Sequence, residues 1–463
     1  MMFVEVRSLK FVCDVAGGTL LKGSADAVFS RVSTDSRQVQ AGDLFFAIKG
    51  EKFDGHEFIR EAGERGAAAV VLAKSLVPEN LPTCAVIAVD EPRAALGKAA
   101  TAYRRQFDLP VIAVGGSNGK TTVKELVASV LRQKFATLWS EASFNNDIGV
   151  PATLLRLNQT HQAAVLEAGT NHPGELAPLV KMIAPKLGII TNIGREHLEF
   201  FGDVAVVAQE EGALAEGLPA DGKLFLNGDS EWSDQIAART PAQIVTVGID
   251  EKNDWCAKKI RLDKNGVTFQ AVTAKAEFCG AYRINLLGQH QVTNALFAIA
   301  IGAELGLERV EIQDGLVACQ PPKMRLNFWE ANGVRVLDDC YNANADSTIA
   351  ALETLCALPL QGRRVAMLGD MGELGAHTES AHAEVGRRAA ELKINQLFAV
   401  GKMASVTAQA ARAAGLVRVF EFADVEGAVK AVKNFLKPGD VVLLKASRSA
   451  RLERIAETLK TEK

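Results

Sequence analysis

The sequence predicts an α/β protein of three domains: a small mixed α/β domain at the N-terminus, a central doubly wound sheet, and a Rossmann-like domain at the C-terminus. Two observations support this fold class. The chain has 463 residues, which suits about three domains of roughly 150 residues each. Short apolar runs also alternate with helical stretches in two successive parts of the chain, a pattern typical of parallel sheets with helices on both faces.

The bulk composition excludes several classes of protein. Apolar residues make up 48% and charged residues 23% of the chain, an ordinary globular balance. The net charge of −3 gives no global basic field for nucleic acid or acidic lipid. No window approaches about 18 uncharged apolar residues, and the N-terminus has no clean signal-peptide core. We therefore expect neither a nucleic-acid partner nor a membrane span.

The cysteines point to a reducing compartment. Seven of them are scattered along the chain, their number is odd, and none forms a C-x-x-C pair. This pattern favours free thiols over a disulfide framework or a zinc site. We expect a cytoplasmic protein, and a monomer.

The first domain is predicted over residues 1–108. Its apolar runs "LFFAIKG" and "AAAVVLA" are separated by Gly, Asp and Ser, as expected for a small mixed α/β domain. The stretch "LGKAATAYRRQFDLP" predicts a connecting helix that stops before Pro110, because the residue before a proline disfavours helical geometry.

The second domain is predicted over residues 109–318. It opens with a strand of the buried type, "PVIAVGG", followed by a helix from about Lys120 to Gln133. The strand-like runs "AAVLEAGT" and "KLGIITNIG" alternate with the helical run "LAPLVKMIA". Near the end of this domain, "GQHQVTNALFAIAIGAELG" predicts a long helix with small residues on its packing face. The alternation predicts a parallel sheet.

The third domain is predicted over residues 319–463. It follows the stretch "CQPPKMR" and repeats the alternation of strand and helix, which predicts a second doubly wound unit. Its strand-like runs are "VRVLDD", "RRVAMLGD", "QLFAVG", "LVRVFEF" and "DVVLLKAS".

The stretch "GGSNGKTT" resembles a phosphate-binding loop, although it has only three residues between Gly115 and Gly119. A strand that ends in glycines and opens a helix presents backbone N–H groups at a positive helix end. Lys120 adds a charge for phosphates, and Thr121 offers a hydroxyl to magnesium. A glycine-rich turn with a surface lysine is the alternative. The order of strand, loop and helix favours a P-loop ATPase-like domain.

Two further side chains follow predicted strands of this domain. Glu167 ends the strand "AVLE", where ligands collect in open α/β sheets, and its carboxylate suits magnesium. His197 follows "IITNIG" and is a second candidate metal ligand. The alternatives are a solvated glutamate and a structural histidine.

The third domain has its own polar strand end. Asp338 and Asp339 close the strand "VRVLDD", where carboxylates can hydrogen-bond to ribose hydroxyls. Nearby, Asp346 or Ser347 is predicted to serve as N-cap for the helix "TIAALETL". Both predictions can hold, because they use different residues.

The motifs together resemble the Mur ligases, the ATP-dependent amide-bond-forming enzymes of peptidoglycan assembly. The resemblance runs from about residue 30 to residue 455, and the shortened loop is the form found in that family. The stretches that carry it are "GGSNGKTT", "SFNNDIGVP", "LEAGTN", "TNIGREHLEFFG", "GQHQVTNALFA" and "DDCYNANADS".

Within the family, three stretches resemble the members that add D-alanyl-D-alanine to UDP-N-acetylmuramoyl-tripeptide. They are "STDSRQVQAGDLFFAIKGEKFDGHEFI", "DDCYNANADS" and "MLGDMGELGAHTESAHAEVG". The resemblance implies that these two molecules are the substrates, with ATP and Mg²⁺ as cofactors.

The resemblance also implies roles for residues around the nucleotide. Thr121 and Glu167 would bind one magnesium, and His197 a second. His290 and Asn294 would lie near the adenine, and Asp339 would hold the ribose. The residues implied in nucleotide binding are Gly116, Ser117, Asn118, Gly119, Lys120, Thr121, Thr122, Asn145, Asn146, His290, Asn294, Arg325, Asp339, Tyr341 and Asn344.

Other positions are implied in substrate binding. Those expected at the uridine nucleotide end are Ser33, Asp35, Ser36, Arg37, Asp54 and His56. Those expected on the dipeptide side of the cleft, or on the adjoining face of the third domain, are Asp370, Met371, Glu373, Leu374, Lys445, Ser447 and Arg448.

One departure from the family pattern concerns the metal site. Most members carry a lysine, in "AKGEI", that is carbamylated and ligates the second magnesium. The stretch "VAVVAQEEGAL" places Glu211 there. We hypothesise that this glutamate replaces the carbamate as a catalytic and metal-binding group; the alternative is a surface helix residue. Three other departures alter packing more than chemistry: "EAGTN" stands where "EMGAN" is usual, Ala345 replaces the usual proline, and Ala446 stands where glycine is common.

The resemblance implies an acyl-phosphate mechanism. ATP would phosphorylate the terminal carboxylate of the tripeptide, and the amine of D-alanyl-D-alanine would then displace phosphate. Lys120, Glu167, His197 and Glu211 would form the catalytic group. The nearer alternative is another ligase of this fold, such as a folylpolyglutamate synthase or another Mur step. The more distant one is a nucleotide-switched regulatory ATPase.

Overall fold

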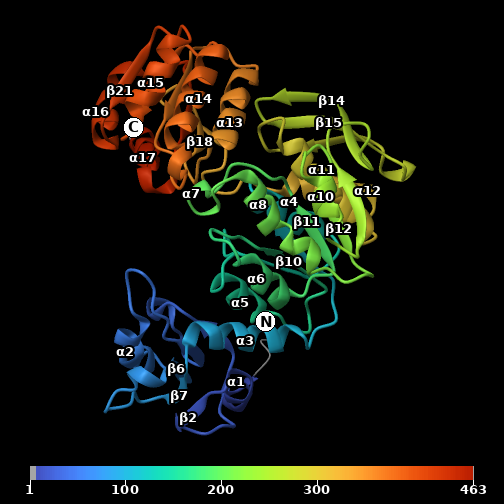
Figure 1. Cartoon of the computed structure of the whole chain (residues 1–463), viewed down its shortest axis with the longest axis vertical. Helices are drawn as coiled ribbons and strands as arrows, with labels where there is room; N and C mark the ends of the chain where they lie inside the picture. Colours follow the sequence, from blue (N-terminus) through green and yellow to red (C-terminus); the bar gives the residue numbers. More distant parts are fainter. Residues whose placement is uncertain (1–6, 462–463) are drawn as a thin grey trace.

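The computed structural model describes residues 7–461 and contains three large sheets that follow one another along the chain (Figure 1). The sheets have five, nine and six strands, and each takes strands from only one of the three predicted segments. The central domain lies between the other two in Figure 1. The predicted three-domain α/β fold is confirmed, whereas the limits at residues 108 and 318 remain predictions.

The N-terminal domain has a five-stranded sheet in the order β2-β7-β6-β5-β4. Strands β4 to β7 are parallel, and β2 pairs antiparallel with β7. Its elements are β1 (Arg7–Ser8), α1 (Leu9–Ala16), β2 (Thr19–Lys22), β3 (Val28–Phe29), β4 (Arg31–Ser33), β5 (Asp43–Phe46), α2 (Ile59–Glu64), β6 (Ala69–Ala73), β7 (Ala85–Val89) and α3 (Pro92–Arg104).

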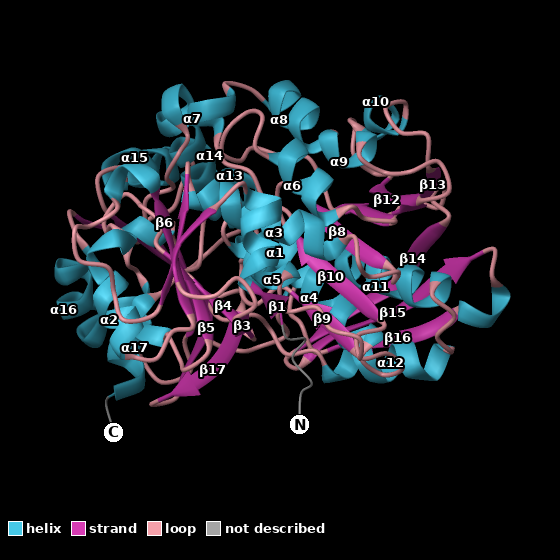
Figure 2. Ribbon diagram, turned by 90° about the horizontal axis from the view of Figure 1, so that it is seen from below, coloured by secondary structure: helices cyan, strands magenta, loops and turns pink. Residues whose placement is uncertain are grey.

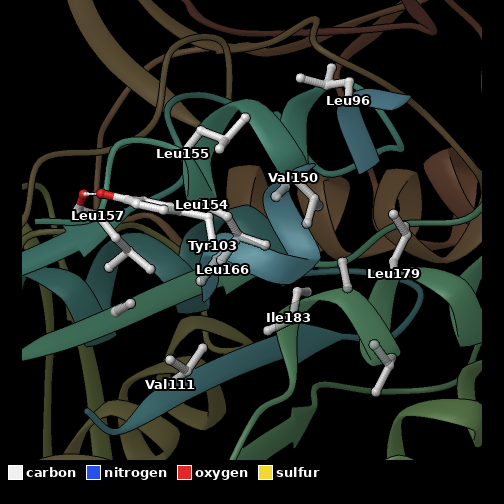
Figure 3. Close-up of a cluster of buried hydrophobic side chains, with 14 of the residues drawn as sticks. Leu96, Tyr103, Val111, Val150, Leu154, Leu155, Leu157, Leu166, Leu179 and Ile183 are labelled. Atoms are coloured by element: carbon white, nitrogen blue, oxygen red, sulfur yellow. Dashed lines mark hydrogen bonds between the residues drawn. The ribbon is translucent and has the colours of Figure 1, made fainter. Parts of the chain in front are cut away.

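Helix α3 is the predicted connecting helix. It begins at Pro92, where Glu91 caps the first turn, and ends at Arg104, ahead of Pro110. The helix packs on the N-terminal sheet and on α5 and α6 of the central domain. The hydroxyl of Tyr103 donates a hydrogen bond to the carbonyl oxygen of Leu157 at 2.7 Å inside the apolar cluster of Figure 3. The two domains therefore share one core along α3.

The central domain has a nine-stranded sheet in the order β16-β15-β14-β13-β12-β11-β8-β10-β9 (Figure 2). Its elements are β8 (Val111–Gly115), α4 (Lys120–Leu131), β9 (Thr137–Trp139), α5 (Gly149–Leu154), β10 (Ala163–Glu167), α6 (Leu176–Ile183), β11 (Leu187–Ile190), α7 (Leu198–Phe201), α8 (Val204–Glu211), α9 (Ala213–Glu216), β12 (Lys223–Asn227), α10 (Ser233–Ala237), β13 (Gln243–Val247), β14 (Trp255–Asp263), β15 (Gly266–Thr273), β16 (Gly280–Ile284), α11 (Gln291–Glu304) and α12 (Arg309–Ala318).

The strand β8 shows why apolar runs mark buried parallel strands. Val111 and Ala113 belong to the hydrophobic cluster on one face of the sheet, and Ile112 and Val114 to the cluster on the other. Successive side chains of a strand point to opposite faces, so a strand covered on both sides is apolar throughout. The loop after Gly115 therefore leaves an interior strand of the sheet, between β10 and β11.

The far edge of this sheet was not predicted. Strands β14, β15 and β16 form an antiparallel extension. The predicted strands are continuous apolar runs, whereas β15 alternates buried and partly buried side chains in its middle. Such alternation is typical of antiparallel strands with one solvated face.

The C-terminal domain has the strand order β17-β18-β22-β19-β20-β21, parallel except for the antiparallel edge strand β17. Its elements are β17 (Asn327–Ala331), β18 (Val334–Asp339), α13 (Ala345–Ala357), β19 (Arg364–Leu368), α14 (Thr378–Glu391), β20 (Gln396–Val400), α15 (Ala404–Ala413), β21 (Val419–Phe422), α16 (Val425–Phe435), β22 (Val441–Lys445) and α17 (Glu453–Thr461).

The predicted N-cap of α13 was wrong. Asn344 caps this helix by accepting a hydrogen bond from the backbone N–H of Ser347, and the Ser347 hydroxyl accepts from the N–H of Asn344. Ser347 is thus the third residue of a reciprocal capping box. Asp346 lies in the first turn, where its carboxylate is free to bind a partner outside the helix.

Across residues 7–461, no helix has both the length and the apolar character needed to cross a bilayer. All seven cysteines are free thiols.

Candidate active site

A cavity of about 450 Å³ lies where loops of the central and C-terminal domains meet. The central domain contributes the loop after β8, the end of β10 and the segment after β11. The C-terminal domain contributes the end of β18 and the start of α13. Because β8, β10 and β11 are parallel neighbours, their carboxyl ends meet at one edge of the sheet, where open α/β sheets bind ligands.

The shortened loop depends on glycine at two positions. Gly116 has φ +106°, and a Cβ atom there would lie 2.4 Å from the Thr191 hydroxyl oxygen. Gly119 has φ +87°, and its Cβ would lie 2.9 Å from Asn294 Oδ1. Left-handed backbone geometry and close neighbours both exclude a larger side chain. The loop thus opens α4 with the N–H groups of the first turn at its exposed end.

The segment after β11 holds this loop from the other side. The backbone N–H of Ser117 donates to the carbonyl oxygen of Asn192 at 2.8 Å, and that of Asn118 donates to Asn192 Oδ1 at 2.8 Å. Thr191 donates its hydroxyl to the carbonyl oxygen of Asn118 at 2.7 Å. The two strand ends therefore form one rigid polar platform.

Lys120 lies at the centre of a cluster of carboxylates. Its ammonium donates to the carbonyl oxygens of Gly116 and Ser117 and to Glu196 Oε2, the last at 3.1 Å. Burial lowers the pKa of Lys120, but Glu196, Glu211 and Glu167 together raise it by more, so the net shift is upward. The lysine therefore stays charged at neutral pH, which suits its predicted contact with phosphate.

Glu167 and Thr121 face the same part of the cavity. Glu167 is buried, and its Oε1 accepts a hydrogen bond from Asn145 Nδ2 at 2.9 Å, whereas Oε2 has no hydrogen-bond partner. The Thr121 hydroxyl lies 3.2 Å from the Ser143 hydroxyl and accepts a hydrogen bond from Arg325 at 3.1 Å. These are hard oxygen donors of the kind that magnesium prefers.

His197 is oriented by a carboxylate of the other domain. Its Nδ1 lies 2.5 Å from Glu373 Oε2, and its Nε2 lies 4.0 Å from Glu196 Oε2. The hydrogen bond from His197 lowers the pKa of Glu373, so this carboxylate is ionised and accepts the Nδ1 proton. In the neutral tautomer with its proton on Nδ1, Nε2 carries the free lone pair, an arrangement that recurs where histidine binds a metal.

Glu211 is not a surface residue, so that alternative was wrong. Its side chain is fully buried beneath the loop, where Oε2 accepts a hydrogen bond from the N–H of Gly116 at 2.6 Å. Its Oε1 has no hydrogen-bond partner. Burial raises the pKa of Glu211 to about 8, against the lowering effect of Lys120. Glu211 does not line the cavity, whereas Glu196 does.

The residues present fit a magnesium ion that is shared with a phosphate. Within residues 7–461, no three or more His, Cys, Asp or Glu side chains form a group able to hold a metal ion by themselves. Magnesium usually takes one or two carboxylates and completes its shell with phosphate oxygens and water. Three buried carboxylate oxygens, on Glu167, Glu196 and Glu211, lack hydrogen-bond partners around one lysine. This excess of negative charge suits a divalent cation.

The C-terminal wall of the cavity is also ordered by hydrogen bonds. Lys445 is buried and donates to Asp339 Oδ2 at 2.6 Å, while Asp339 Oδ1 accepts from the N–H of Leu326. The Arg325 guanidinium lies over the ring of Tyr341, 4.4 Å from its centroid. These contacts fix the side chains that the sequence analysis assigned to the ribose and the phosphates.

Most of the predicted nucleotide residues meet at this cavity. The predicted site residues that line it are Ser117, Asn118, Gly119, Lys120, Thr121, Thr122, Asn145, Glu167, His197, His290, Asn294, Arg325, Asp339, Tyr341, Asn344, Glu373, Leu374 and Lys445.

Several other predicted residues have local structural contacts instead. Asn146 Oδ1 accepts the N–H groups of Ile148 and Gly149 at the start of α5. The carboxylate of Asp370 accepts the N–H groups of Lys402 and Met403. Predicted residues that do not line the cavity are Gly116, Asn146, Glu211, Asp370, Met371, Ser447 and Arg448, together with those of the N-terminal domain.

The N-terminal residues form a separate group at the carboxyl edge of their own sheet. Asp35 follows β4 and accepts hydrogen bonds from the backbone and guanidinium of Arg37. Asp54 caps a 3₁₀ helix and pairs with His56 Nδ1 at 2.6 Å, while His56 Nε2 accepts the N–H of Ala73 at the end of β6. Ser33 and Ser36 are buried beside them. Their predicted contact with a uridine nucleotide remains a prediction.

Several polar residues at the cavity were not predicted as site residues, among them Asn192, Glu196 and Asp346, with Arg195 beside it. Three of them belong to "TNIGREHLEFFG", where only His197 was selected. The signal that could have identified Arg195 and Glu196 is that they are charged and directly precede a histidine that follows a parallel strand. Their partners lie on other segments, so the pairing itself was not readable from the sequence.

Comparison with known proteins identifies relatives along the whole chain. Three family models match: Mur ligase family, catalytic domain, over residues 28–104; Mur ligase middle domain over 114–302; and Mur ligase, glutamate ligase domain, over 324–448. The chain is 34% identical to the UDP-N-acetylmuramoyl-tripeptide--D-alanyl-D-alanine ligase of Escherichia coli over 98% of both chains, and 34% identical to that of Bacillus subtilis, also over 98% of both.

Solved structures are also similar to this chain over nearly its whole length. A crystal structure of MurF from Acinetobacter baumannii has a TM-score of 0.90 and 31% identity and is covered completely, as is this chain. MurF ligase from Thermotoga maritima in complex with ADP has a TM-score of 0.79 and 25% identity, over 93% of this chain and 97% of that one.

The first prediction concerns Gly119→Ala. The new methyl group would meet Asn294 at the mouth of the loop, so we expect ADP to bind at least tenfold more weakly in isothermal titration. The matched control is Gly415→Ala, because Gly415 has a similar φ of +95° but nothing within 4 Å of its Cβ position. Strain alone costs roughly 1–2 kcal/mol at either site. Equal ADP affinity in both variants and the parent chain would contradict the placement of the nucleotide.

The second prediction concerns pH. The pKa of Glu211, about 8 when folded, lies above the value of about 4.3 for an unfolded glutamate. The stability from this difference is fully present below pH 4.3 and is lost as the pH rises through about 8. The side chain of the Glu211→Gln variant cannot ionise. In buffer that contains EDTA, the urea midpoint of this variant should therefore rise relative to that of the parent chain as the pH increases from 5 to 9. Exposed Glu79→Gln serves as the control, and parallel pH profiles for the Glu211 variant and its parent would refute this.

Proposed function

We infer the function of this chain from one premise: it belongs to the Mur ligase family. It is an ATP-dependent ligase that joins D-alanyl-D-alanine to UDP-N-acetylmuramoyl-tripeptide. The products are UDP-N-acetylmuramoyl-pentapeptide, ADP and phosphate, and the reaction supplies a precursor for peptidoglycan. It thereby serves cell-wall growth, cell shape and division.

The observation that carries this proposal is the cavity between the two domains. The loop lysine, Lys120, and the strand-end carboxylate, Glu167, lie on one side of it, and Asp339 lies on the other. A nucleotide with its phosphates at the first turn of α4 and its ribose at Asp339 would fill the space between them. The full-length similarity to ligases of this reaction supports the same placement.

The first step activates a carboxylate, which is by itself a poor acyl donor. An oxygen of the terminal carboxylate of the tripeptide attacks the γ-phosphorus of ATP, and ADP leaves. Lys120 and the N–H groups at the start of α4 offset the charge on the transferring phosphoryl group. Arg325 is placed to add a second positive charge from the C-terminal domain.

The second step forms the amide. The amine of D-alanyl-D-alanine attacks the acyl carbon, the carbon–oxygen bond to phosphate breaks, and the amine loses a proton. Water must be excluded, because acyl phosphates hydrolyse. We propose that the C-terminal domain supplies this exclusion by turning about the segment 319–323, which lies in the connection from α12 to β17 and contains the proline pair.

We propose that Thr121 and Glu167 would hold one Mg²⁺ and that His197 would hold a second. Bound magnesium supplies charge neutralisation at the phosphates. Glu211 takes the place of the carbamylated lysine of most relatives, since it is anionic when ionised and has a free oxygen beside Lys120. Glu211 lies behind the loop and does not line the cavity, so Glu196 is the carboxylate nearer to it.

The remaining assignments rest on the same premise. The polar residues at the carboxyl edge of the N-terminal sheet, among them Asp35, Asp54 and His56, are proposed to bind the uridine nucleotide. Glu373 and Leu374 are proposed to border the dipeptide. We place the enzyme in the cytoplasm, where its seven thiols stay reduced. A solved folylpolyglutamate synthase shares only the fold, at 16% identity, so it gives no support to that alternative.

The third prediction tests the reaction itself. Incubation with UDP-N-acetylmuramoyl-tripeptide, D-alanyl-D-alanine and Mg-ATP should give the pentapeptide product by mass spectrometry, with one ADP released for each amide formed. Lys120→Ala should reduce the rate by at least a thousandfold, because it removes the charge at the phosphates. ATP hydrolysis that is independent of both substrates and gives no amide would instead identify a nucleotide-switched protein.

The fourth prediction tests the role of Glu211. Glu211→Ala should lower the rate at least tenfold and raise the magnesium concentration needed for half-maximal rate. Glu211→Lys restores the residue usual in relatives, so its rate should increase with added bicarbonate, which supplies the carbamate, while the parent enzyme shows no such response. Full activity and unchanged magnesium dependence in Glu211→Ala would show that Glu211 has no part in metal binding.

A further inference from the structure

Arg195 makes the most extensive polar contact between the central and C-terminal domains. Its backbone N–H donates to Asp346 Oδ2 at 2.9 Å, and its Nε and Nη2 donate to Asp346 Oδ1 at 2.9 and 2.6 Å. Its Nη1 and Nη2 donate to Glu384 Oε2 and Oε1 at 2.5 and 3.1 Å. One arginine thus bridges two carboxylates of the other domain, a geometry that we call the Arg195 clasp.

The clasp lies at the rim of the nucleotide cavity. Arg195 belongs to the segment between β11 and α7, two residues before His197. Asp346 lies in the first turn of α13 and itself lines the cavity, and Glu384 lies on α14. Gly194 gives room for this contact, since a Cβ atom there would lie 2.9 Å from Asp346 Oδ2. The clasp therefore lies where the two domains face each other across the cavity.

Weaker contacts accompany it. Asn344 Nδ2 donates to Asn118 Oδ1 at 3.0 Å, and the N–H of Glu199 donates to the carbonyl oxygen of Glu373 at 3.0 Å. In the part of the chain that the structure describes, the ion pairs between these domains involve only Arg195 and His197, and the histidine is charged only when protonated. Figure 1 shows α7 beside the C-terminal domain, in keeping with these contacts.

The strength of the clasp follows from its geometry. Single exposed ion pairs contribute about 0–1 kcal/mol, but a bidentate, charge-assisted contact that joins three charges is stronger. The three side chains are 33–37% exposed, so salt screens them only in part. The central and C-terminal domains each have a hydrophobic cluster of their own, so the fold of either domain does not require the clasp.

We propose that Arg195 is a positioning residue: its clasp holds the C-terminal domain closed over the P-loop, so that both halves of the nucleotide site are present before ATP binds. The proposal rests on the proposed function for its effect on ATP. If the closed form becomes a minor population, the apparent affinity for a ligand that needs both domains falls by the same fraction. Saturating ATP restores closure, so the maximal rate is affected less than the KM for ATP.

The experiment compares Arg195→Ala and Glu384→Gln with Arg388→Ala. Arg388 is the matched control, because it also lies on α14 and pairs with a glutamate, Glu353, but within one domain. We expect Arg195→Ala to raise the KM for ATP about tenfold while kcat changes less than threefold, and to increase the radius of gyration in small-angle X-ray scattering. Glu384→Gln should shift both in the same direction by less. The control should match the parent in both.

Two further measurements separate positioning from damage to the fold. Arg195→Lys keeps the positive charge but not the bidentate guanidinium. Its KM for ATP and its radius of gyration should therefore lie between those of Arg195→Ala and those of the parent enzyme. Adding salt should expand the parent enzyme but leave Arg195→Ala unchanged. The proposal is overturned if Arg195→Ala matches Arg388→Ala in radius of gyration and in KM, or if it loses kcat alone. Scattering and ADP titration need no ligase reaction, so they decide the clasp even if the assigned reaction fails.

Discussion

The balance of buried charge around Lys120 is the constraint on which the rest of the site depends. One ammonium is surrounded by Glu167, Glu196 and Glu211, and each of these carboxylates keeps one oxygen without a hydrogen-bond partner. A buried unpaired charge is costly, so such an arrangement is stable only if a proton or a cation relieves it. Burial raises the pKa of Glu211 to about 8, which favours a proton there, and a bound divalent cation would offset the remaining negative charge. Metal, nucleotide and loop geometry are thereby coupled at one point.

This coupling explains why the site is divided between two domains. The central domain supplies the rigid half, because its loop is tied to the ends of β8 and β11 through Asn192 and Thr191. The C-terminal domain supplies Asp339, Lys445 and Arg325 as a second wall. An acyl phosphate needs a site that opens for three substrates and then excludes water. The Arg195 clasp and the pair of His197 and Glu373 join the two domains beside this site.

Much of the fold and part of the site could be predicted because their causes are local. The strand before the loop, the helix from Lys120 and the carboxylate at Glu167 follow from apolar runs and glycine positions in short windows. The antiparallel edge of β14 to β16 was missed because alternating strands give a weaker signal than buried ones. The cap of α13 was misplaced by two or three residues, since Asn344, Asp346 and Ser347 are all good capping residues and only backbone geometry selects among them.

The sequence by itself determined the three-domain α/β order, the phosphate-binding loop and the family to which the chain belongs, because each is encoded in contiguous residues. Only the tertiary structure decided what those residues contact. The sequence shows that residue 211 is a glutamate, but not that it is buried beneath Gly116. It likewise does not show that Arg195 pairs with Asp346 and Glu384. The physical reason is that burial and pairing arise when segments more than ninety residues apart meet, and no local pattern records that meeting.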